Sequence, residues 1–385
     1  MMLPNGWKKV RLSELGTFSK GCGIKRDEAN SGSIPAIRYG EIYTAHNDYI
    51  KQFQSFISEN VAKEATLLKN GDLLFSCSGE TKEDIGKCVA FVSNERAYAG
   101  GDIIILSPTV PCDSKYIGFL CNSSFVNKQR YSFAQGDSIV HISSESIGKI
   151  EIPFPPLNEQ KKIAAMLSVW DSAIEKMEKL IEFKESQKKS LIKKLIEKQE
   201  EKANKIKVGN VTIDKNKWKH ERIGNVLKIG HGKDYKGLSL GKVPVFGSGG
   251  YMTSVDKFLH DGETVCIGRK GTIDKPFYYK GKIWTVDTLF YTYDFKNVIP
   301  KFIYYVFCSI PWKIKNEAGG VPSLTSKIVE NVEFYSPSLP EQQIIVDVLS
   351  NADDELSLLK QQLENYKKQK QGLMQKLLTG QWRVK

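Results

Sequence analysis

Short loops that combine glycine with cationic or hydroxyl side chains are the parts of this chain best suited to holding a ligand. The sequence Gly268-Arg-Lys-Gly-Thr272 directly follows a strand-like run from Thr264. Its glycines allow close backbone approach, and its cations reach phosphate oxygens or guanine edges. Ser76-Cys-Ser-Gly-Glu-Thr-Lys82 occupies the equivalent place in the first half. A polar, glycine-rich loop is more often only a turn, so recurrence in both halves is what favours a binding role.

Further loops share this composition, namely Lys20 to Arg26, Arg38-Tyr39, Gly230-His-Gly-Lys233 and Phe246-Gly-Ser-Gly-Gly250. Together the loops supply a set of side chains that are candidates for contact with DNA. The candidates are Lys20, Lys25, Arg26, Arg38, Tyr39, Ser78, Thr81, Lys82, His231, Lys233, Ser248, Arg269, Lys270 and Thr272.

The charge balance agrees with a polyanionic partner, but only for one segment. The net charge is +12, and a basic protein of this size often binds nucleic acid. Residues 206–335 hold 20 Lys/Arg and 12 Asp/Glu, whereas residues 1–157 hold 17 of each. A DNA-binding role for the first half therefore cannot rest on its net charge.

Motifs that would indicate catalysis or a resident cofactor are missing from the sequence. The string nearest to the Asn/Asp-Pro-Pro-aromatic loop of an adenine methyltransferase is Phe154-Pro-Pro-Leu157, which lacks the leading amide or carboxylate. Gly230-His-Gly-Lys233 fails the phosphate-binding loop pattern because no Ser or Thr follows the lysine. The five histidines show no metal spacing, and the seven cysteines form no CxxC pair. We expect no catalytic residues, no metal and no cofactor on this chain.

The chain repeats itself as two pairs of segments. Leu157-Asn-Glu-Gln160 and Leu339-Pro-Glu-Gln342 begin stretches that align without gaps at an offset of 182. The preceding segments repeat more weakly, with Trp7 matching Trp218 at offset 211 and Lys115 matching Lys301 at offset 186. Changing offsets indicate insertions in loops. The order is therefore A–B–A′–B′.

Both B segments have the apolar spacing of a heptad seam, which predicts two helices of about 40–45 residues. Lysines interrupt the seam at the matched positions Lys188 and Lys370, either where the seam loosens or where a partner binds. The seam residues are Ile163, Leu167, Ile174, Met177, Ile181, Leu191, Leu195, Ile345, Leu349, Leu356, Leu359, Leu363, Leu373 and Leu377.

A single long helix with one exposed apolar stripe is not stable in isolation. Because a globular segment between the helices lets the chain return, the simplest solution is an intramolecular antiparallel coiled coil. This topology brings the C-terminus back to the first domain. Packing of each helix on its own domain, or pairing with another molecule, are the alternatives.

The A segments alternate short strand-like runs with glycine-rich turns and end in helical stretches, Lys115 to Arg130 and Lys301 to Lys315. The predicted fold class is mixed α/β: two similar domains joined by two long antiparallel coiled-coil helices, with an internal pseudo-twofold repeat. The predicted boundaries are 1–156 for the first domain, 157–204 for the first helix, 205–338 for the second domain and 339–385 for the second helix.

Location is predicted from what the sequence lacks. No charged and apolar leader follows Met1, and Phe302 to Ile310 is too short to span a bilayer. With no disulfide pattern, these features predict a soluble protein of the reducing cytoplasm.

This organisation resembles the specificity subunits of type I restriction-modification systems over essentially the whole chain. The most specific matches are Pro155-Pro-Leu-Asn-Glu-Gln160, Leu339-Pro-Glu-Gln342 and Gln375-Lys-Leu-Leu-Thr-Gly380. One departure is that the first long helix ends in Leu195-Ile-Glu-Lys-Gln-Glu instead of repeating Leu378-Thr-Gly380. The resemblance implies that the A segments are target-recognition domains and the B segments a conserved spacer.

The resemblance also implies a non-catalytic subunit that reads an asymmetric site of two short blocks in double-stranded DNA. Two modification (methyltransferase) subunits would bind it, carrying S-adenosylmethionine, and restriction subunits would add ATP- and magnesium-dependent translocation and cleavage. The alternatives are a stand-alone coiled-coil DNA-binding scaffold without methyltransferase partners, and a coiled-coil adaptor that binds other proteins.

Overall fold

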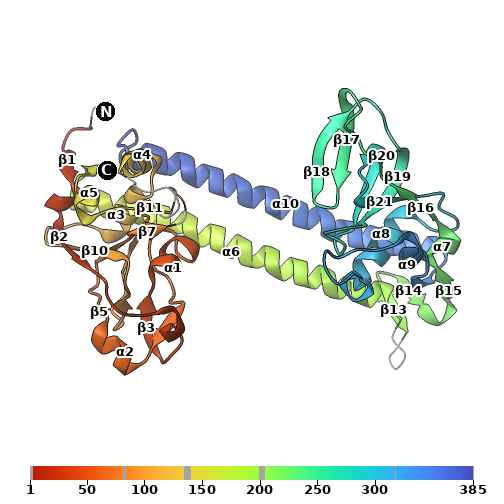
Figure 1. Ribbon diagram of the computed structural model, residues 1–385, viewed down its shortest axis with the longest axis horizontal. Coiled ribbons are helices and arrows are strands. Elements are labelled where there is room, and N and C mark those ends of the chain that lie inside the picture. Colours follow the sequence, from red (N-terminus) through yellow and green to blue (C-terminus); the bar gives the residue numbers. More distant parts are fainter. Residues whose placement is uncertain are drawn as a thin grey trace. The chain divides into compact units, whose positions relative to one another are not determined.

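The computed structural model describes residues 3–79, 81, 84–133, 140–198, 204–316 and 318–384. The chain divides into two compact units: unit 1 comprises Met1–Met177 and Gln362–Lys385, and unit 2 comprises Glu178–Gln361. Each unit contains a globular α/β part and one stretch of each of two long helices (Figure 1). The predicted mixed α/β fold with two long helices is confirmed.

The main sheet of unit 1 has four antiparallel strands in the order β2-β10-β6-β8. Its central strand β10 carries the run Ile103 to Leu106, which is fully buried because both faces of the sheet are covered. A separate antiparallel pair, β1-β12, joins the start of the globular part to the segment before the first long helix. These strands are β1 (Lys8–Arg11), β2 (Gly16–Lys20), β6 (Leu73–Ser76), β8 (Cys88–Ala90), β10 (Ile103–Pro108) and β12 (Glu151–Phe154).

A second small sheet, β4-β3-β9-β5, and a short pair, β7-β11, complete the strands described in unit 1. Their bounds are β3 (Ile34–Ile37), β4 (Ser55–Ile57), β5 (Thr66–Leu67), β7 (Ser78–Gly79), β9 (Tyr98–Ala99) and β11 (Val140–His141). The short helices are α1 (Tyr39–Thr44), α2 (Glu59–Glu64), α3 (Ser114–Cys121), α4 (Ser124–Ser132) and α5 (Ser144–Gly148).

Unit 2 has one six-stranded sheet in the order β16-β21-β19-β20-β17-β18, with β17 parallel to β20 and the other neighbours antiparallel. The pairs β13-β14 and β15-β22 flank it in the chain. The strands are β13 (Lys205–Val208), β14 (Val211–Asp214), β15 (Lys219–Arg222), β16 (Lys228–His231), β17 (Leu240–Gly247), β18 (Gly250–Val255), β19 (His260–Gly268), β20 (Phe277–Thr285), β21 (Leu289–Tyr293) and β22 (Glu333–Ser336). The short helices are α7 (Ile223–Val226), α8 (Pro300–Ser309) and α9 (Ser326–Glu330).

The internal repeat is confirmed by backbone hydrogen bonds at matching positions of the two units. The amide of Cys77 donates to the carbonyl of Asp102 in unit 1 (3.0 Å), and that of Arg269 donates to Thr288 in unit 2 (2.8 Å). The matched glycines Gly21 and Gly232 both pass close to a carbonyl. A Cβ at either would lie about 2 Å from a backbone oxygen, 2.0 Å at Gly21 and 1.9 Å at Gly232. Both positions therefore require glycine.

Two predicted helices are shorter than expected. The stretch Lys115 to Arg130 is broken into α3 and α4, because the Ser123 side chain accepts a hydrogen bond from the Val126 amide and caps a new helix. In unit 2, α8 ends at Ser309 because Pro311 cannot continue it, and a 3-10 turn, Trp312–Lys315, follows.

The long helices α6 (Leu157–Ile196) and α10 (Leu339–Leu378) have 40 residues each, as predicted. In unit 1, Asp171 of α6 meets Lys370 of α10, and in unit 2, Lys184 meets Glu355. In unit 2, Lys188 meets Asp353 as well, and in unit 1 the earlier residue Leu167 shares a core with the later residue Leu377. Residue numbers therefore rise along α6 as they fall along α10, so the helices are antiparallel within each unit (Figure 1). Nine of the predicted seam residues are buried, namely Ile163, Leu167, Ile181, Leu195, Ile345, Leu349, Leu356, Leu363 and Leu377. The other five, Ile174, Met177, Leu191, Leu359 and Leu373, are partly buried.

The ends of the long helices also belong to the globular cores. Ile163 and Leu167 at the start of α6 share the unit 1 core with Leu377 at the end of α10. In unit 2, Leu195 shares a core with Ile345 and Leu349. Pairing between the helices and packing of each helix on a domain were alternatives in the sequence, and both occur.

The repeated Glu-Gln dipeptides attach the start of each long helix to its unit. The Gln160 side chain accepts a hydrogen bond from the Asp113 amide (2.9 Å) and donates to the Pro155 carbonyl (2.8 Å). Gln342 makes the equivalent bonds to Ile299 (2.8 Å) and Pro337 (3.0 Å). Both glutamines are fully buried, so each side chain satisfies buried backbone groups that water cannot reach.

The described ends of the chain meet in unit 1, as the antiparallel topology predicts. The Arg383 guanidinium donates to the carbonyl of Asn5 (3.0 Å) and to Glu159 Oε1 (2.7 Å). Glu159 is buried and also accepts a hydrogen bond from the Trp7 indole (3.0 Å). The C-terminal segment is therefore hydrogen-bonded to both the N-terminal segment and the start of α6.

Candidate nucleic-acid interface

Four loops of unit 2 are joined by backbone hydrogen bonds at one end of the six-stranded sheet. We call residues 231–236, 246–250, 268–272 and 285–288 loop cluster 2. The Lys233 amide donates to Thr285 (2.8 Å), Val286 to Phe246 (2.9 Å) and Arg269 to Thr288 (2.8 Å). The sequence-predicted loops around Lys233, Ser248 and Arg269 therefore form one surface.

Loop 268–272 is held by two backbone hydrogen bonds to residues 322–324. The Gly271 amide donates to the Pro322 carbonyl (2.8 Å), and the Leu324 amide donates to Arg269 (2.8 Å). Gly271 has a φ of +88°, which a side chain would strain, and its missing Cβ faces Ser248 Oγ. The glycine thus lets this loop turn tightly beside the β17–β18 hairpin.

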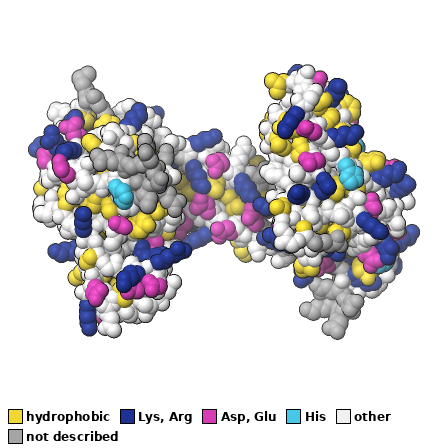
Figure 2. All heavy atoms as spheres, in the orientation of Figure 1, with side chains coloured by type: hydrophobic (Ala, Val, Ile, Leu, Met, Phe, Trp, Pro, Cys, Tyr) yellow, Lys and Arg dark blue, Asp and Glu magenta, His cyan; other side chains and the backbone are white. Residues whose placement is uncertain are grey.

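Loop cluster 2 contains an open cleft of about 720 Å³. Its walls come from three of the four loops and from the start of β18. Figure 2 shows Lys and Arg side chains spread over the visible face of both units, with acidic side chains between them. The lining residues are Asp234, Tyr235, Lys236, Gly247, Ser248, Gly249, Gly250, Tyr251, Met252, Val286, Asp287 and Thr288.

The equivalent loops of unit 1 also meet. We call residues 20–26, 37–39, 77–79 and 100–102 loop cluster 1. The Gly21 amide donates to Ile103 (2.8 Å), Gly100 to Ile37 (2.9 Å) and Cys77 to Asp102 (3.0 Å). Burial raises the pKa of the Cys77 thiol, and the nearby Asp102 carboxylate adds to the rise, so this thiol is neutral at pH 7.

The sequence-predicted residues of unit 2 all lie in loop cluster 2. His231, Lys233, Arg269 and Lys270 are exposed, whereas Ser248 and Thr272 are partly buried. The His231 ring contacts Phe290 edge-on, with centroids 5.0 Å apart. The Arg269 guanidinium donates from Nη1 to the carbonyl of Asp287 (3.0 Å), which fixes its direction and leaves its other N–H groups for a ligand.

The sequence-predicted residues of unit 1 differ more in their exposure to solvent. Lys20, Lys25, Arg26, Tyr39 and Thr81 are exposed.

Two other predicted residues of unit 1 are engaged with the protein itself. Arg38 donates from Nε to the buried Glu41 (3.1 Å), so part of its donor capacity is used internally. Ser78 is buried and hydrogen-bonded to His141 (3.1 Å). Lys82 lies outside the described residues.

Sequence reasoning did not identify the acidic and aromatic side chains that line the cleft. Tyr251 and Met252 are 63% and 51% exposed at the start of β18, and Asp287 is exposed in the loop before β21. None of them belongs to a cationic or glycine-rich string, apart from the position of Tyr251 directly after Gly250. Their signal is positional: Tyr251 and Met252 begin β18, and Asp287 meets Arg269 only in three dimensions.

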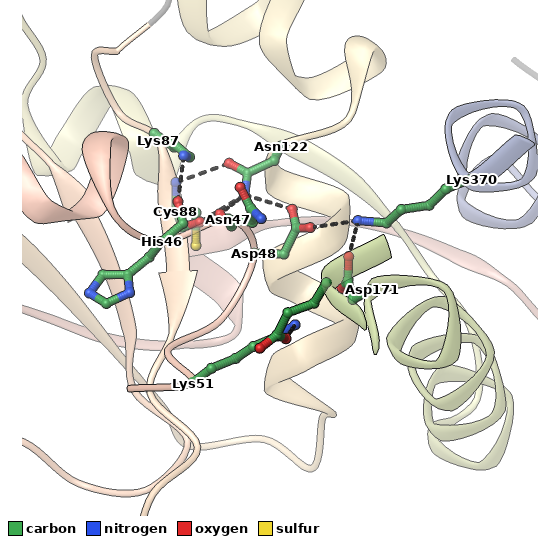
Figure 3. A network of polar contacts seen from close by, with 10 residues as sticks. His46, Asn47, Asp48, Lys51, Lys87, Cys88, Asn122, Asp171 and Lys370 are labelled. Carbon is green, nitrogen blue, oxygen red and sulfur yellow. Dashed lines mark hydrogen bonds and ion pairs between the residues drawn. The ribbon is translucent and has the colours of Figure 1, made fainter. Parts of the chain in front are cut away.

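Partly buried lysines link the long helices to each other. In unit 1, Lys370 contacts Asp171 (2.6 Å) and Asp48 (3.2 Å), and all three side chains are at most 13% exposed (Figure 3). Burial alone would lower the pKa of Lys370, but the two carboxylates outweigh it and raise the pKa. The Lys370 ammonium is shared between two carboxylates, so its effect on each is incomplete and burial still raises the pKa of Asp171. The matched pair in unit 2 is Lys188 with Asp353, which also accepts from the Tyr305 hydroxyl (2.7 Å).

These pairs explain the two lysines that interrupt the predicted seam. They replace apolar contacts by an interaction that forms only when lysine and aspartate face each other across the helices. A buried polar pair of this kind can specify the register and direction of helix pairing.

The end of α6 in unit 2 is capped by a buried side chain. Lys215 is 3% exposed, and its ammonium donates to the carbonyls of Lys194 (2.8 Å) and Glu197. Burial lowers the pKa of Lys215 to about 8, against the opposing effect of Glu197. In unit 1 the matched helix end is Gly380, with a φ of +75°, packed on Pro4. The departure noted in the sequence therefore corresponds to a different way of ending the helix.

None of the helices in the described ranges is long and apolar enough to cross a membrane. Among the same residues, no group of three or more His, Cys, Asp and Glu side chains is placed to hold a metal ion.

Comparison with known proteins defines the family. The family model described as "Type I restriction modification DNA specificity domain" matches the chain twice, at residues 4–185 and 190–367. The chain therefore belongs to this family of DNA-specificity proteins, as the repeated Glu-Gln helix starts predict.

Two relatives match over almost their full length, and a third matches over part of its length. The chain is 22% identical to the type I restriction enzyme MjaVIII specificity subunit and 25% identical to the putative MjaX specificity subunit, both from Methanocaldococcus jannaschii. Each alignment covers 100% of this chain and 95% of the relative. The EcoKI specificity subunit of Escherichia coli is 28% identical over 43% of this chain and 36% of its own length.

Solved structures share the fold. The S subunit of a type I restriction-modification system from M. genitalium superimposes with a TM-score of 0.63 at 18% identity, covering 98% of both chains.

Proposed function

We propose that this chain is the DNA-specificity subunit of a type I restriction-modification complex and reads a bipartite, asymmetric site with one loop cluster per unit. The observation that carries this proposal is the pair of loop clusters, built on matched hydrogen bonds but lined by different side chains. Equivalent scaffolds with different loops suit the reading of two different DNA blocks. Arg269 and Lys270 in loop cluster 2 are the side chains best placed to contact phosphate or guanine.

The chain itself is proposed to be non-catalytic and cytoplasmic, and to act as the scaffold for its partners. Two modification subunits would carry S-adenosylmethionine, and restriction subunits would carry the ATP- and magnesium-dependent activities. Large apolar side chains exposed on the long helices support a scaffold role, since a partner would remove them from water. Examples are Val169, Phe183 and Leu358, at 69%, 63% and 66% exposure.

The test is the double substitution Arg269→Ala and Lys270→Ala in the complex with the modification subunits. We expect weaker DNA binding through one half-site. Loss of phosphate contacts would reduce affinity for all sequences and make the salt dependence shallower, whereas loss of a guanine contact would relax one position by ~1–3 kcal/mol. A titration of labelled DNA at several salt concentrations separates these results.

The control is Lys257→Ala, which removes an exposed cation of unit 2 outside loop cluster 2. Unchanged affinity and specificity in the double variant would show that loop 268–272 is only a turn. Methyl transfer by the purified chain without partners would contradict its non-catalytic role.

A further inference from the structure

Two acidic side chains, Asp234 and Asp287, line the cleft of loop cluster 2, and Asp234 accepts a hydrogen bond from the Lys236 amide. Asp287 is exposed and lines the cleft, between Val286 and Thr288. No ion pair or hydrogen bond involves its carboxylate within the described parts of the chain. The neighbouring Arg269 donates to the backbone carbonyl of Asp287 and not to its carboxylate. A free carboxylate repels phosphate, so it weakens nonspecific binding wherever it approaches the DNA backbone.

The backbone that carries this carboxylate is fixed by hydrogen bonds. Thr288 accepts from the Arg269 amide (2.8 Å), and the Leu289 amide donates to the Val286 carbonyl (2.9 Å) and closes the turn around Asp287. Because the turn is already held, only the short Asp287 side chain has to be ordered when it forms a hydrogen bond to a ligand.

A carboxylate can only accept hydrogen bonds at neutral pH, and DNA offers few donors to accept from. In the major groove these donors are the exocyclic amines, N4 of cytosine and N6 of adenine. The adjacent Arg269 is a donor, suited to O6 and N7 of guanine. The two side chains therefore place a donor and an acceptor next to each other, which matches the edge of a G·C pair or of two neighbouring pairs.

We propose that Asp287 is a specificity-determining residue that accepts a hydrogen bond from an exocyclic base amine in the half-site read by unit 2. The inference rests on the proposed function and adds the chemical group that this unit selects. It explains why an acidic side chain lies within a basic loop cluster: its repulsion of phosphate is offset only where an amine is present.

The experiment is selection of preferred sites from random DNA by the complex of the full chain with its modification subunits. Asp287→Ala should lose the preference at one position of one block, where discrimination falls by about 5- to 150-fold, equivalent to ~1–3 kcal/mol. If the wild type selects cytosine there, Asp287→Asn should shift the position toward adenine, because an amide pairs with adenine N6 and N7; if it selects adenine, Asp287→Asn should keep that preference. The second block should stay unchanged in both variants, which shows that the complex is intact.

The matched control is Asp261→Asn, which removes the same charge from an exposed side chain near the opposite end of β19. It should leave every position of the selected site unchanged. If Asp287→Ala also keeps every preference and only raises affinity for all sequences alike, Asp287 is an electrostatic feature and the inference is wrong.

A second measurement identifies the amine. At the affected position, cytosine is replaced by 2-pyrimidinone, or adenine by purine, so that only the amine is removed. The wild-type complex should lose affinity by about the same factor as Asp287→Ala, and the variant should lose nothing further. Additive losses would overturn the contact. If the wild-type complex selects no sequence at all, the proposed function fails as well, whereas normal selection with an unaffected variant overturns this inference alone.

Discussion

Replacement of Lys370 by Met tests whether the buried ion pairs hold the long helices in place. Lys370 is 13% exposed, and its partners Asp48 and Asp171 are each 8% exposed. The substitution keeps the size of the side chain but removes the ion-pair partner that two buried carboxylates share. Removing one partner of a buried ion pair costs about 3–5 kcal/mol. We expect a loss of that size in the free energy of opening of unit 1.

Peptide-resolved hydrogen exchange is the suitable assay, because it reports the opening of unit 1 separately from that of unit 2. Lys188→Met is the matched variant in unit 2. Its pair is more exposed, 18% and 28%, so its loss should be smaller. Lys149→Met breaks a surface pair, exposed by 57% and 79%, and should change stability by no more than ~0.5 kcal/mol. If Lys370→Met loses as little stability as Lys149→Met, the ion pairs of Lys370 do not stabilise the helix pair of unit 1.

Three further predictions concern helix ends and helix length. Lys215→Met should remove a pH dependence of unit 2. The folded pKa of about 8 lies below the ordinary value of 10.5, so wild-type stability rises by about 2–3 kcal/mol between pH 8 and 10.5, as the buried charge is lost. Urea unfolding at both pH values checks this, and an equal rise in the variant would contradict it. A circular permutant that joins Lys385 to Met1 and opens near Lys202 should fold and bind partners, because Arg383 contacts Asn5. Circular dichroism tests whether it folds, and co-purification tests whether it binds. An unfolded product would argue against the antiparallel topology. Insertion of one heptad at matched positions of α6 and α10 should lengthen only the unspecified gap of the DNA site. The expected increase is ~3 base pairs, at 1.5 Å per helical residue and 3.4 Å per base pair. An unchanged gap in the selected sites would show that the helices do not set the length of the gap.

The repeat and the long helices could be predicted because they follow from local periodicity. Leucine and isoleucine at heptad spacing define α6 and α10, and the repeated Glu-Gln dipeptide marks both helix starts. The role of that dipeptide was not predictable in the same way. Gln160 bonds to Asp113, which is 47 residues away, and no periodic pattern indicates such a contact.

The lysines that interrupt the apolar seam indicate the register of the two helices, which the apolar periodicity alone does not. Asp171 and Asp353 repeat at the same offset as Lys188 and Lys370. In an antiparallel pair, residues that face each other have numbers with a constant total, and these two Lys–Asp pairs share the same total. The register of the helices was thus present in the sequence, and it becomes readable once both the repeat and the antiparallel direction are assumed.

The candidate interface was only partly predictable. Glycine and cations identify loop 268–272 as a flexible, charged string, and the structure places it beside Ser248 and Lys233. Asp287 was missed because a single acid at a strand end has no local signature. The internal use of Arg38 was also hidden, since its partner Glu41 becomes buried only when α1 packs.

The central claim, that each unit of this chain reads one block of a bipartite DNA site, is tested most directly by methylome sequencing. The host would carry the modification subunits with either the wild-type chain or the Arg269→Ala, Lys270→Ala variant. We predict that wild-type methylation falls on adenines in a two-block motif with an unspecified gap, and that the variant weakens or relaxes one block only. Methylation of the same motif when this chain is deleted, or equal change of both blocks in the variant, would contradict the account.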